Sequence, residues 1–302
     1  MNPHPSFLIL GATAVGKSAF AVAVAERCNG EIVSADAFQI YAGFDLLTVK
    51  PSPELRTRVP HHLIGEVPLT ESWDVARWLD AALRRIAEIH ERGRVPIVVG
   101  GTGLYFRTLT RGLAELPPAS APLRAELESQ PLAELQRRLE KLDVEGARRI
   151  DLQNPRRVIR ALEVCLLTGR PFSSFREQWN HAPSGWRGIV LTRDREELYA
   201  RIDERTVEMF AGGVVEEVRA LHEVGATASQ TLGLREIRAH LAGEMTEAEC
   251  IAAIQQATRR YAKRQLTWFR RETEFPGVNL TTLAGESALA DEISREVMCV
   301  SS

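Results

Sequence analysis

The chain has few cysteines, no cysteine pair and no cysteine-rich cluster. Its 4 cysteines, among 302 residues, lie far apart, without a Cys-x-x-Cys motif or a cysteine and histidine cluster at zinc-finger spacing. The chain is also long enough to bury a core of its own without disulfide bonds. These observations exclude a disulfide-stapled miniprotein, and we expect the thiols to be reduced.

Long hydrophobic runs are also missing. No segment of 18 consecutive apolar residues occurs, and the N-terminal residues have neither the basic start nor the long apolar stretch of a signal peptide. We therefore expect a cytoplasmic protein without a membrane partner.

An excess of charge of one sign is the third missing feature. The sequence has 38 Lys and Arg against 40 Asp and Glu, a formal net charge of -2. Nothing global indicates a polyanionic partner, so any basic surface must be local. With 44% hydrophobic and 26% charged residues, the composition is that of a folded globular protein, and the length suggests about two domains.

Short apolar runs alternate with helical patterns in the first third of the chain. The runs at 7–10, 31–36 and 95–99 have the length of buried strands, and 18–28 has the length of a helix. A further helix is predicted before Gly93 from apolar residues at helical spacing: Val75, Trp78, Leu79, Ala82, Leu83, Ile86 and Ile89. This alternation predicts an α/β fold with a parallel sheet covered by helices on both faces.

The pattern changes to helices alone between residues 116 and 187. One helix there has clear signals, with Asn154 as N-cap, Pro155 at its first position and Gly169 as its stop. A return strand is predicted at 189–191, followed by helices at 195–224 and 247–271, and the tail past Val278 carries no clear pattern. We expect a core domain of 1–115 and 188–302, interrupted by a mostly helical insertion domain of 116–187.

A phosphate-binding loop follows the first predicted strand. Its residues match G-x4-G-K-[ST]: Gly11, Ala12, Thr13, Ala14, Val15, Gly16, Lys17 and Ser18. The glycines let backbone N–H groups turn toward an anion, Lys17 adds a point charge, and the Ser18 hydroxyl can bind Mg²⁺. A chance match at a tight turn is the alternative, but the strand before and the helix after it favour a P-loop α/β fold.

The loop alone does not say which diphosphate compound binds. A nucleotide hydrolase usually has an acid at the end of a later strand, but the strand at 95–99 runs into Gly100-Gly101-Thr102. The only acid at the end of an early strand is Asp36. An ordinary nucleotide hydrolase is therefore not the favoured interpretation.

The order and spacing of the motifs identify a family. The chain resembles the bacterial tRNA dimethylallyltransferases (tRNA isopentenyltransferases) from Leu8 to about Arg271. The residues that carry the resemblance are GATAVGKS (11–18), SADAFQIYAGFD (34–45), TVKP (48–51), PHHLI (60–64), GGTGLYF (100–106), NPRRVIRALEV (154–164), RIDERTVEMFAGGVVEEV (201–218), LGLRE (232–236) and TRRYAKRQLTWFRR (258–271). Departures from the usual pattern are Ala12, Val15, Ser18, Ala37, Phe38, Ala42, Leu47 and Leu234.

The resemblance implies transfer of a dimethylallyl group from dimethylallyl diphosphate to N6 of an adenine beside the tRNA anticodon. The departing diphosphate concentrates negative charge, which the loop, Lys17 and Mg²⁺ on Ser18 would stabilise. By resemblance Thr102 and Arg205 also face the diphosphate. A turn residue remains the alternative for Thr102, and a solvated helix charge paired with a neighbouring glutamate the alternative for Arg205.

Asp36 is the candidate general base. The adenine N6 is a weak nucleophile that must lose a proton, and Asp36 ends a strand at the edge where α/β proteins place ligands. A carboxylate that caps a helix, or one that supports a metal without binding it directly, remains the alternative.

Several segments are implied to contact the tRNA anticodon stem-loop. By resemblance these are Asp36, Ala37, Phe38 and Gln39; Arg156, Arg157, Val158, Ile159 and Arg160; Gln230, Thr231, Leu232, Gly233, Leu234 and Arg235; and also Thr102 and Arg124. From Gly146 to Arg187 there are eight arginines and three acids, a local charge of +5. That excess fits a local RNA surface.

Two other features favour structural roles. Ile254, Tyr261 and Trp268 share a face at helical spacing, which is more typical of core than of base stacking. His61 and His62 are adjacent on an extended segment, so they point opposite ways, and no acid or cysteine partner is near in the sequence.

Other functions remain open. An adenylate isopentenyltransferase and a small-molecule P-loop kinase share the phosphate loop, but neither explains the basic insertion. A non-catalytic nucleotide-gated RNA-binding module is disfavoured because the loop and Asp36 are both retained. We expect a monomeric enzyme.

Overall fold

The computed structural model describes residues 6–179, 185–283 and 285–298, and the chain divides into two compact units. The larger unit comprises residues 1–110 and 184–302, and the smaller unit 111–183. The insertion predicted from the sequence has nearby boundaries, 116 and 187. Its role as a separate tRNA-contacting domain stays a prediction.

A parallel sheet forms the centre of the larger unit. Its strands lie in the order β3-β2-β4-β1-β5-β6, and every neighbouring pair is parallel. The strands are β1 (Phe7–Gly11), β2 (Gly30–Ala35), β3 (His61–His62), β4 (Val95–Gly100), β5 (Arg187–Thr192) and β6 (Gly277–Asn279). The predicted α/β fold is confirmed, although the short strands β3 and β6 were not expected.

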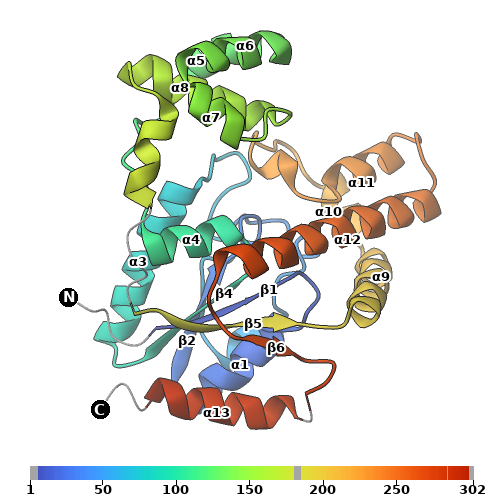
Figure 1. Cartoon of the computed structure of the whole chain (residues 1–302). Helices are drawn as coiled ribbons and strands as arrows, with labels where there is room; N and C mark the ends of the chain where they lie inside the picture. The colour runs from blue at the N-terminus through green and yellow to red at the C-terminus, as the bar shows by residue number, and fades with distance from the viewer. Residues whose placement is uncertain (1–5, 180–184, 284, 299–302) are drawn as a thin grey trace. The chain divides into compact units, whose positions relative to one another are not determined.

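Helices cover both faces of this sheet (Figure 1). Alternation along β1 sends Phe7 and Ile9 into one apolar cluster and Leu8 and Leu10 into the other. The first cluster includes α1 (Lys17–Arg27) and α13 (Glu286–Met298), and the second includes α3 (Val75–Glu91) and α4 (Gly103–Arg111). Between the two clusters, parallel pairing brings the carboxyl ends of β1, β2 and β4 side by side.

The remaining helices of the larger unit differ in part from the prediction. They are α2 (Pro53–Arg58), α9 (Arg195–Ala211), α10 (Val214–Arg219), the 3-10 turn η2 (Ala228–Gln230), α11 (Leu234–Leu241) and α12 (Glu247–Glu272). The single helix expected over 195–224 is wrong, because Gly213 adopts φ 94° and breaks it in two. Helices α11 and α13 were not predicted.

The smaller unit is helical, as expected. It contains α5 (Ala121–Glu128), α6 (Leu132–Leu142), α7 (Val144–Arg149), α8 (Pro155–Thr168) and the 3-10 helix η1 (Phe172–Trp179). The signals predicted for α8 are confirmed: the Asn154 side chain accepts a hydrogen bond from the Arg157 amide, and Gly169 ends the helix at φ 65°. Leu127, Leu135 and Leu162 form its core.

Some side chains lie elsewhere than expected. Leu83, an expected core position of α3, is 46% exposed. His62 has an acidic partner after all, because its Nε2 lies 2.6 Å from Glu31 Oε2 on the neighbouring strand. Sequence spacing could not show that pairing.

The described cysteines are free thiols, as expected. Cys28, Cys165 and Cys250 are buried and free, and Cys299 lies outside the described residues. Within the described ranges, no helix has the length and apolar character needed to cross a bilayer.

Candidate active site

The phosphate loop joins β1 to α1 as predicted. Gly16 takes φ 105° immediately before α1, a conformation that glycine adopts without strain and that directs the loop around the helix N-terminus. Lys17 Nζ lies 2.6 Å from the Ala12 carbonyl oxygen and donates to it. The lysine thus folds back over the loop, and its charge lies where an anion would bind.

Three arginines, one between β5 and α9 and two on α9, contact consecutive residues of the loop. Arg193 Nε donates to the Val15 carbonyl at 2.9 Å, and Arg201 Nε donates to the Ala14 carbonyl at 3.0 Å. Arg205 Nη2 donates to Thr13 Oγ1 at 2.8 Å. Arg193 also pairs with Glu197 and Glu286, but no ion pair of Arg201 or Arg205 occurs in the described part of the chain.

The charges of Lys17 and Arg205 are held in a poorly solvated place. Burial lowers the pKa of Lys17 to about 8, an effect that the Asp36 carboxylate opposes and that the Arg205 charge reinforces. Burial and the neighbouring Arg201 likewise lower the pKa of Arg205 to about 10. Both cations are therefore destabilised without an anion, which favours the binding of a strongly negative ligand. The alternative of Arg205 as a solvated helix charge does not fit this position.

Asp36 stands directly after β2, beside the phosphate loop. Its Oδ1 accepts hydrogen bonds from the amides of Phe38 at 2.9 Å and Gln39 at 3.2 Å. Among the described residues, Oδ2 has no such partner. One carboxylate oxygen therefore fixes the turn, and the other is available to a substrate.

Thr102 lies next to Asp36 rather than on the phosphate loop. Its Oγ1 accepts a hydrogen bond from the Ala37 amide at 3.2 Å, and its own amide donates to the Ala35 carbonyl. The order β2-β4-β1 accounts for this, because the ends of β2 and β4 are neighbours. The catalytic role predicted for Thr102 stays a prediction.

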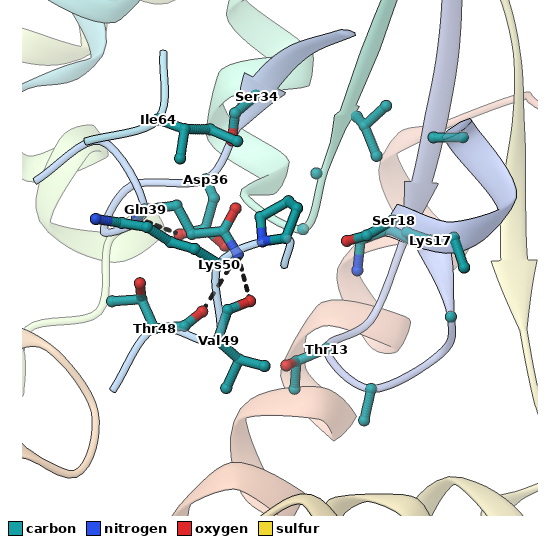
Figure 2. A pocket seen from close by; sticks show the side chains of 18 of the residues that line it. Thr13, Lys17, Ser18, Ser34, Asp36, Gln39, Thr48, Val49, Lys50 and Ile64 are labelled. Carbon is teal, nitrogen blue, oxygen red and sulfur yellow. Dashed lines mark hydrogen bonds between the residues drawn. The ribbon is translucent and has the colours of Figure 1, made fainter. Parts of the chain in front are cut away.

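A pocket of about 420 Å³ is lined by the phosphate loop, Asp36, Arg201 and Arg205, but Thr102 is not among its lining residues. Figure 2 shows this pocket from close by. In Figure 2, Thr13, Lys17 and Ser18 lie on one side, and Asp36, Gln39, Thr48 and Val49 on the other. A second pocket of about 80 Å³ shares Thr13, Asp36, Arg205 and Tyr261 with the first and adds apolar walls from Leu47, Met209, Leu232 and Ile254. The larger, charged pocket and the smaller, more apolar pocket therefore adjoin each other and have part of their lining in common.

The loop before α2 forms one wall of both pockets. Val49 has φ 48°, an unfavourable conformation for a β-branched residue, and it lines both pockets. Two side chains hold this loop: Gln39 Nε2 donates to the Thr48 and Val49 carbonyls, and Glu217 accepts from the Leu46 and Leu47 amides at 2.8 Å each. The Gln39 amide group is thus engaged within the protein, although the residue was predicted to contact tRNA.

Tyr261 and Gln265, two pocket residues on α12, were not predicted as site residues. Tyr261 is only partly buried and lines both pockets, so its assignment to the core is wrong, whereas Ile254 is 2% exposed as expected, although it also lines the smaller pocket. Gln265 is buried, accepts a hydrogen bond from the Thr13 amide at 2.9 Å and donates to the Gly101 carbonyl at 2.8 Å. The motif TRRYAKRQLTWFRR contains both residues, but their partners lie far away in sequence.

The candidate tRNA residues of α8 separate into two groups. Arg156 and Arg157 are exposed, while Val158 and Ile159 are buried in the core of the smaller unit, which excludes contact of these two side chains with RNA. Arg160 and Arg124 both pair with the buried Glu163, at 2.6 and 3.0 Å. Their charges therefore stabilise the fold of this unit.

The segment 230–235 is also divided. Gln230 and Arg235 are exposed, and Leu232 lines the smaller pocket. Thr231, Gly233 and Leu234 are buried, so the Leu234 side chain belongs to the apolar core and does not reach a base. Phe38 lines the smaller pocket, and Ala37 packs against the core.

The described residues contain no cluster of three or more His, Cys, Asp or Glu side chains placed to hold a metal ion. The Ser18 hydroxyl and the Asp36 carboxylate do line the same pocket. Such oxygen groups suit Mg²⁺ when phosphate oxygens and water supply the other ligands.

Comparison with known proteins decides the family. A family model described as IPP transferase matches residues 39–272, and a second, described as isopentenyl transferase, matches 5–57. The chain belongs to the IPP transferase family. A tRNA dimethylallyltransferase of Geobacter metallireducens is 48% identical over 277 residues, which cover 88% of this chain and 90% of the relative. That of Akkermansia muciniphila is 42% identical, with 97% of this chain and 99% of the relative covered.

Solved structures of IPP transferases have the same fold. The tRNA isopentenylpyrophosphate transferase of Bacillus halodurans is 35% identical with a TM-score of 0.71, and the match covers 99% of this chain and 98% of that one. A eukaryotic dimethylallyltransferase acting on tRNA is 27% identical with a TM-score of 0.84, over 98% of this chain and 80% of that one. The predicted resemblance and fold are confirmed.

Proposed function

We propose that this protein transfers a dimethylallyl group from dimethylallyl diphosphate to N6 of the adenine adjacent to the tRNA anticodon. The observation that carries the proposal is a single pocket lined by the phosphate loop, Arg205 and Asp36. In this pocket, the cations of Lys17 and Arg205 lie near the Asp36 carboxylate. The cations suit a leaving diphosphate, and the carboxylate suits the removal of a proton from the attacking adenine. The shared family membership supports the same reaction.

The diphosphate is assigned to the phosphate loop. When the bond between the allyl carbon and the diphosphate oxygen breaks, negative charge collects on the diphosphate, and Lys17 and Arg205 would stabilise it. Their lowered pKa values fit this role, because a bound anion restores the favourable environment that burial removed. Arg201, which the sequence did not single out, lies on the same side and lines the pocket.

Asp36 is assigned as the general base. As the adenine nitrogen forms its bond to the allyl carbon, the N6 proton would pass to Asp36 Oδ2, while Oδ1 keeps its bonds to the turn. The apolar walls of the smaller pocket would shield the cation-like allyl carbon from water. Thr102 would position the Asp36 turn through its bond to Ala37.

Mg²⁺ is proposed as the metal, held by Ser18 together with diphosphate oxygens. It would neutralise charge on the leaving diphosphate. The tRNA is assigned to the exposed residues Gln230, Arg235, Arg156 and Arg157, with the adenine near Asp36 and Phe38. We also propose that the enzyme is a monomer and acts in the cytoplasm.

One assay separates this function from its alternatives. The protein is incubated with dimethylallyl diphosphate and Mg²⁺, and with unmodified tRNA, AMP or ATP as the second substrate. We expect mass spectrometry to find one dimethylallyl group on an adenine of tRNA and none on AMP. Modified AMP would favour an adenylate isopentenyltransferase, and ATP turnover without prenyl transfer would favour a small-molecule kinase.

A further inference from the structure

Helix α12 connects the two loops that carry the proposed leaving-group site and the proposed base. The Gln265 side chain is buried, and each end of its amide has a partner on a different loop. Oε1 accepts from the Thr13 amide of the phosphate loop at 2.9 Å, and Nε2 donates to the Gly101 carbonyl of the loop after β4 at 2.8 Å. A single side chain therefore bridges both loops.

The loop after β4 is shaped to receive α12. A Cβ atom at Gly101 would lie 2.3 Å from Gln265 Nε2, and one at Gly103 would lie 2.4 Å from the Trp268 ring. Real Cβ contacts are not that short, so the glycines of this loop allow the helix to approach. Packing against α12 thus explains Gly101 and Gly103, whereas Gly100 is explained by the close approach of Ala35 on β2.

The connection continues to the proposed base. Thr102 follows Gly101, and its hydroxyl accepts from the amide of Ala37, the residue after Asp36. The Tyr261 hydroxyl, one turn earlier on α12, lies beside both Thr102 and Gln265. The path from Thr13 to the Asp36 turn therefore runs through the Gln265 side-chain amide, the peptide unit between Gly101 and Thr102, and the Thr102 hydroxyl.

We infer that Gln265 is a positioning residue, which fixes the phosphate loop and the Asp36 turn at the separation that group transfer requires. The inference rests on the proposed function. Transfer between two bound substrates depends on their mutual position, and a displacement of about 1 Å costs on the order of 100-fold in rate. Loss of the bridge should therefore slow the reaction of bound substrates more than it weakens binding of either one.

The test uses Gln265→Glu, because the charge state of the introduced carboxyl group determines which hydrogen bonds it can make. The protonated carboxyl group can accept from Thr13 and donate to Gly101, as glutamine does, whereas the ionised group has no donor and faces the Gly101 carbonyl. Gln255→Glu is the matched control, since Gln255 lies on the same helix but donates to the Asp203 carbonyl on α9.

We measure the single-turnover transfer rate with both substrates saturating, and the affinity for inorganic diphosphate, from about pH 5.5 to pH 8.5. At the alkaline end we expect Gln265→Glu to be slower than the wild type by about 10- to 100-fold. Its diphosphate affinity should stay within about threefold. The ratio of variant to wild-type rate should rise as the pH falls, and Gln255→Glu should give a flat ratio near one.

Three results would overturn the inference: a flat ratio for Gln265→Glu, a wild-type rate, or a loss of diphosphate affinity as large as the loss of rate. If this variant does not fold, Gln265→Leu replaces it, and a slower rate with retained diphosphate affinity is again expected. A wild-type protein that transfers nothing would contradict the proposed function instead, because the diphosphate measurement does not depend on transfer.

Discussion

Individual residues at the carboxyl edge of the sheet hold opposite charges close together. Lys17 and Arg205 carry their cations into a poorly solvated pocket, and the Asp36 carboxylate partly compensates them. The Asp36 side chain also has a structural duty, because Oδ1 holds the Phe38 and Gln39 amides. A substitution at this position must separate the two roles.

Asp36→Asn separates them, because the side-chain amide oxygen can still accept from the turn while basicity is lost. We expect kcat to fall by about 10²- to 10⁴-fold. The affinity for inorganic diphosphate should be retained or improved, since a nearby negative charge is removed. Asp36→Ala should lose the turn bonds as well and unfold at a lower temperature than Asp36→Asn. Weakened diphosphate binding with an unchanged kcat in Asp36→Asn would contradict the role of base.

The lowered pKa of Lys17 predicts a pH dependence of anion binding. Below about pH 8 the lysine of the empty pocket is protonated and attracts diphosphate, and above it the charge is lost. We expect diphosphate affinity to fall as the pH rises through 8, and binding near that pH to take up protons. Calorimetry in buffers of different ionisation enthalpy measures this uptake.

Lys17→Arg serves as the reference for that measurement, because a guanidinium keeps its charge over the same range. In Lys17→Arg, the pH dependence that comes from the lysine is removed, and only the pH dependence that comes from protonation of the diphosphate itself remains. An identical pH dependence in the two proteins would contradict the assignment to Lys17.

Local sequence predicted the residues whose partners are close in the chain. The phosphate loop, the Asp36 turn and the ends of α8 follow from capping, glycine conformation and strand length. The partners of Gln265 and Glu217 lie more than 150 residues away, so no spacing rule could find them. Burial is also a tertiary property, which is why Leu234 was predicted to face RNA although it is 1% exposed.

At the scale of elements, one wall of both pockets is the irregular loop before α2, which helix α10 holds through Glu217. Glu217 on α10 accepts from the Leu46 and Leu47 amides, and this brings Val49 into both pockets despite its unfavourable φ of 48°. Because several hydrogen bonds fix this loop, it keeps its conformation before the substrate binds, even with an unfavourable φ at Val49.

Glu217→Ala tests that element. Two backbone amides lose a charged acceptor, so we expect a loss of about 1–3 kcal/mol in the free energy of unfolding. The KM for dimethylallyl diphosphate should also rise, because the pocket wall loosens. Denaturant unfolding and steady-state kinetics measure these quantities.

Glu216→Ala is the control for Glu217→Ala. It removes the neighbouring carboxylate, whose partner is the exposed Arg219, and should change stability by less than about 0.5 kcal/mol. Equal effects of the two substitutions would contradict the role of Glu217.

At the scale of the whole molecule, a net charge of -2 conceals a basic segment. The smaller unit uses some of its arginines internally, since Arg124 and Arg160 neutralise the buried Glu163. Arg156 and Arg157 at the start of α8 are exposed and have no ion pair among the described residues. They are the best candidates for phosphate contacts.

Replacing Arg156 and Arg157 together with glutamate should weaken tRNA binding. Each lost phosphate contact should reduce the slope of log affinity against log salt by about 0.7 to 0.9. The affinity for inorganic diphosphate should not change. Filter binding at several salt concentrations measures the slope, with the exposed Arg137→Glu on α6 as a control in the same unit. A slope unchanged from that of the wild type would contradict the assignment.

The central claim is that the pocket joins a dimethylallyl group to one adenine of tRNA. The most direct measurement incubates the wild-type protein, Mg²⁺ and isotope-labelled dimethylallyl diphosphate with an anticodon stem-loop that has adenine or guanine beside the anticodon, followed by nucleoside analysis. We predict label on N6 of that adenine, release of diphosphate in equal amount, and no label in the guanine stem-loop. Label in neither RNA, with dimethylallyl diphosphate bound but unreacted, would contradict the account.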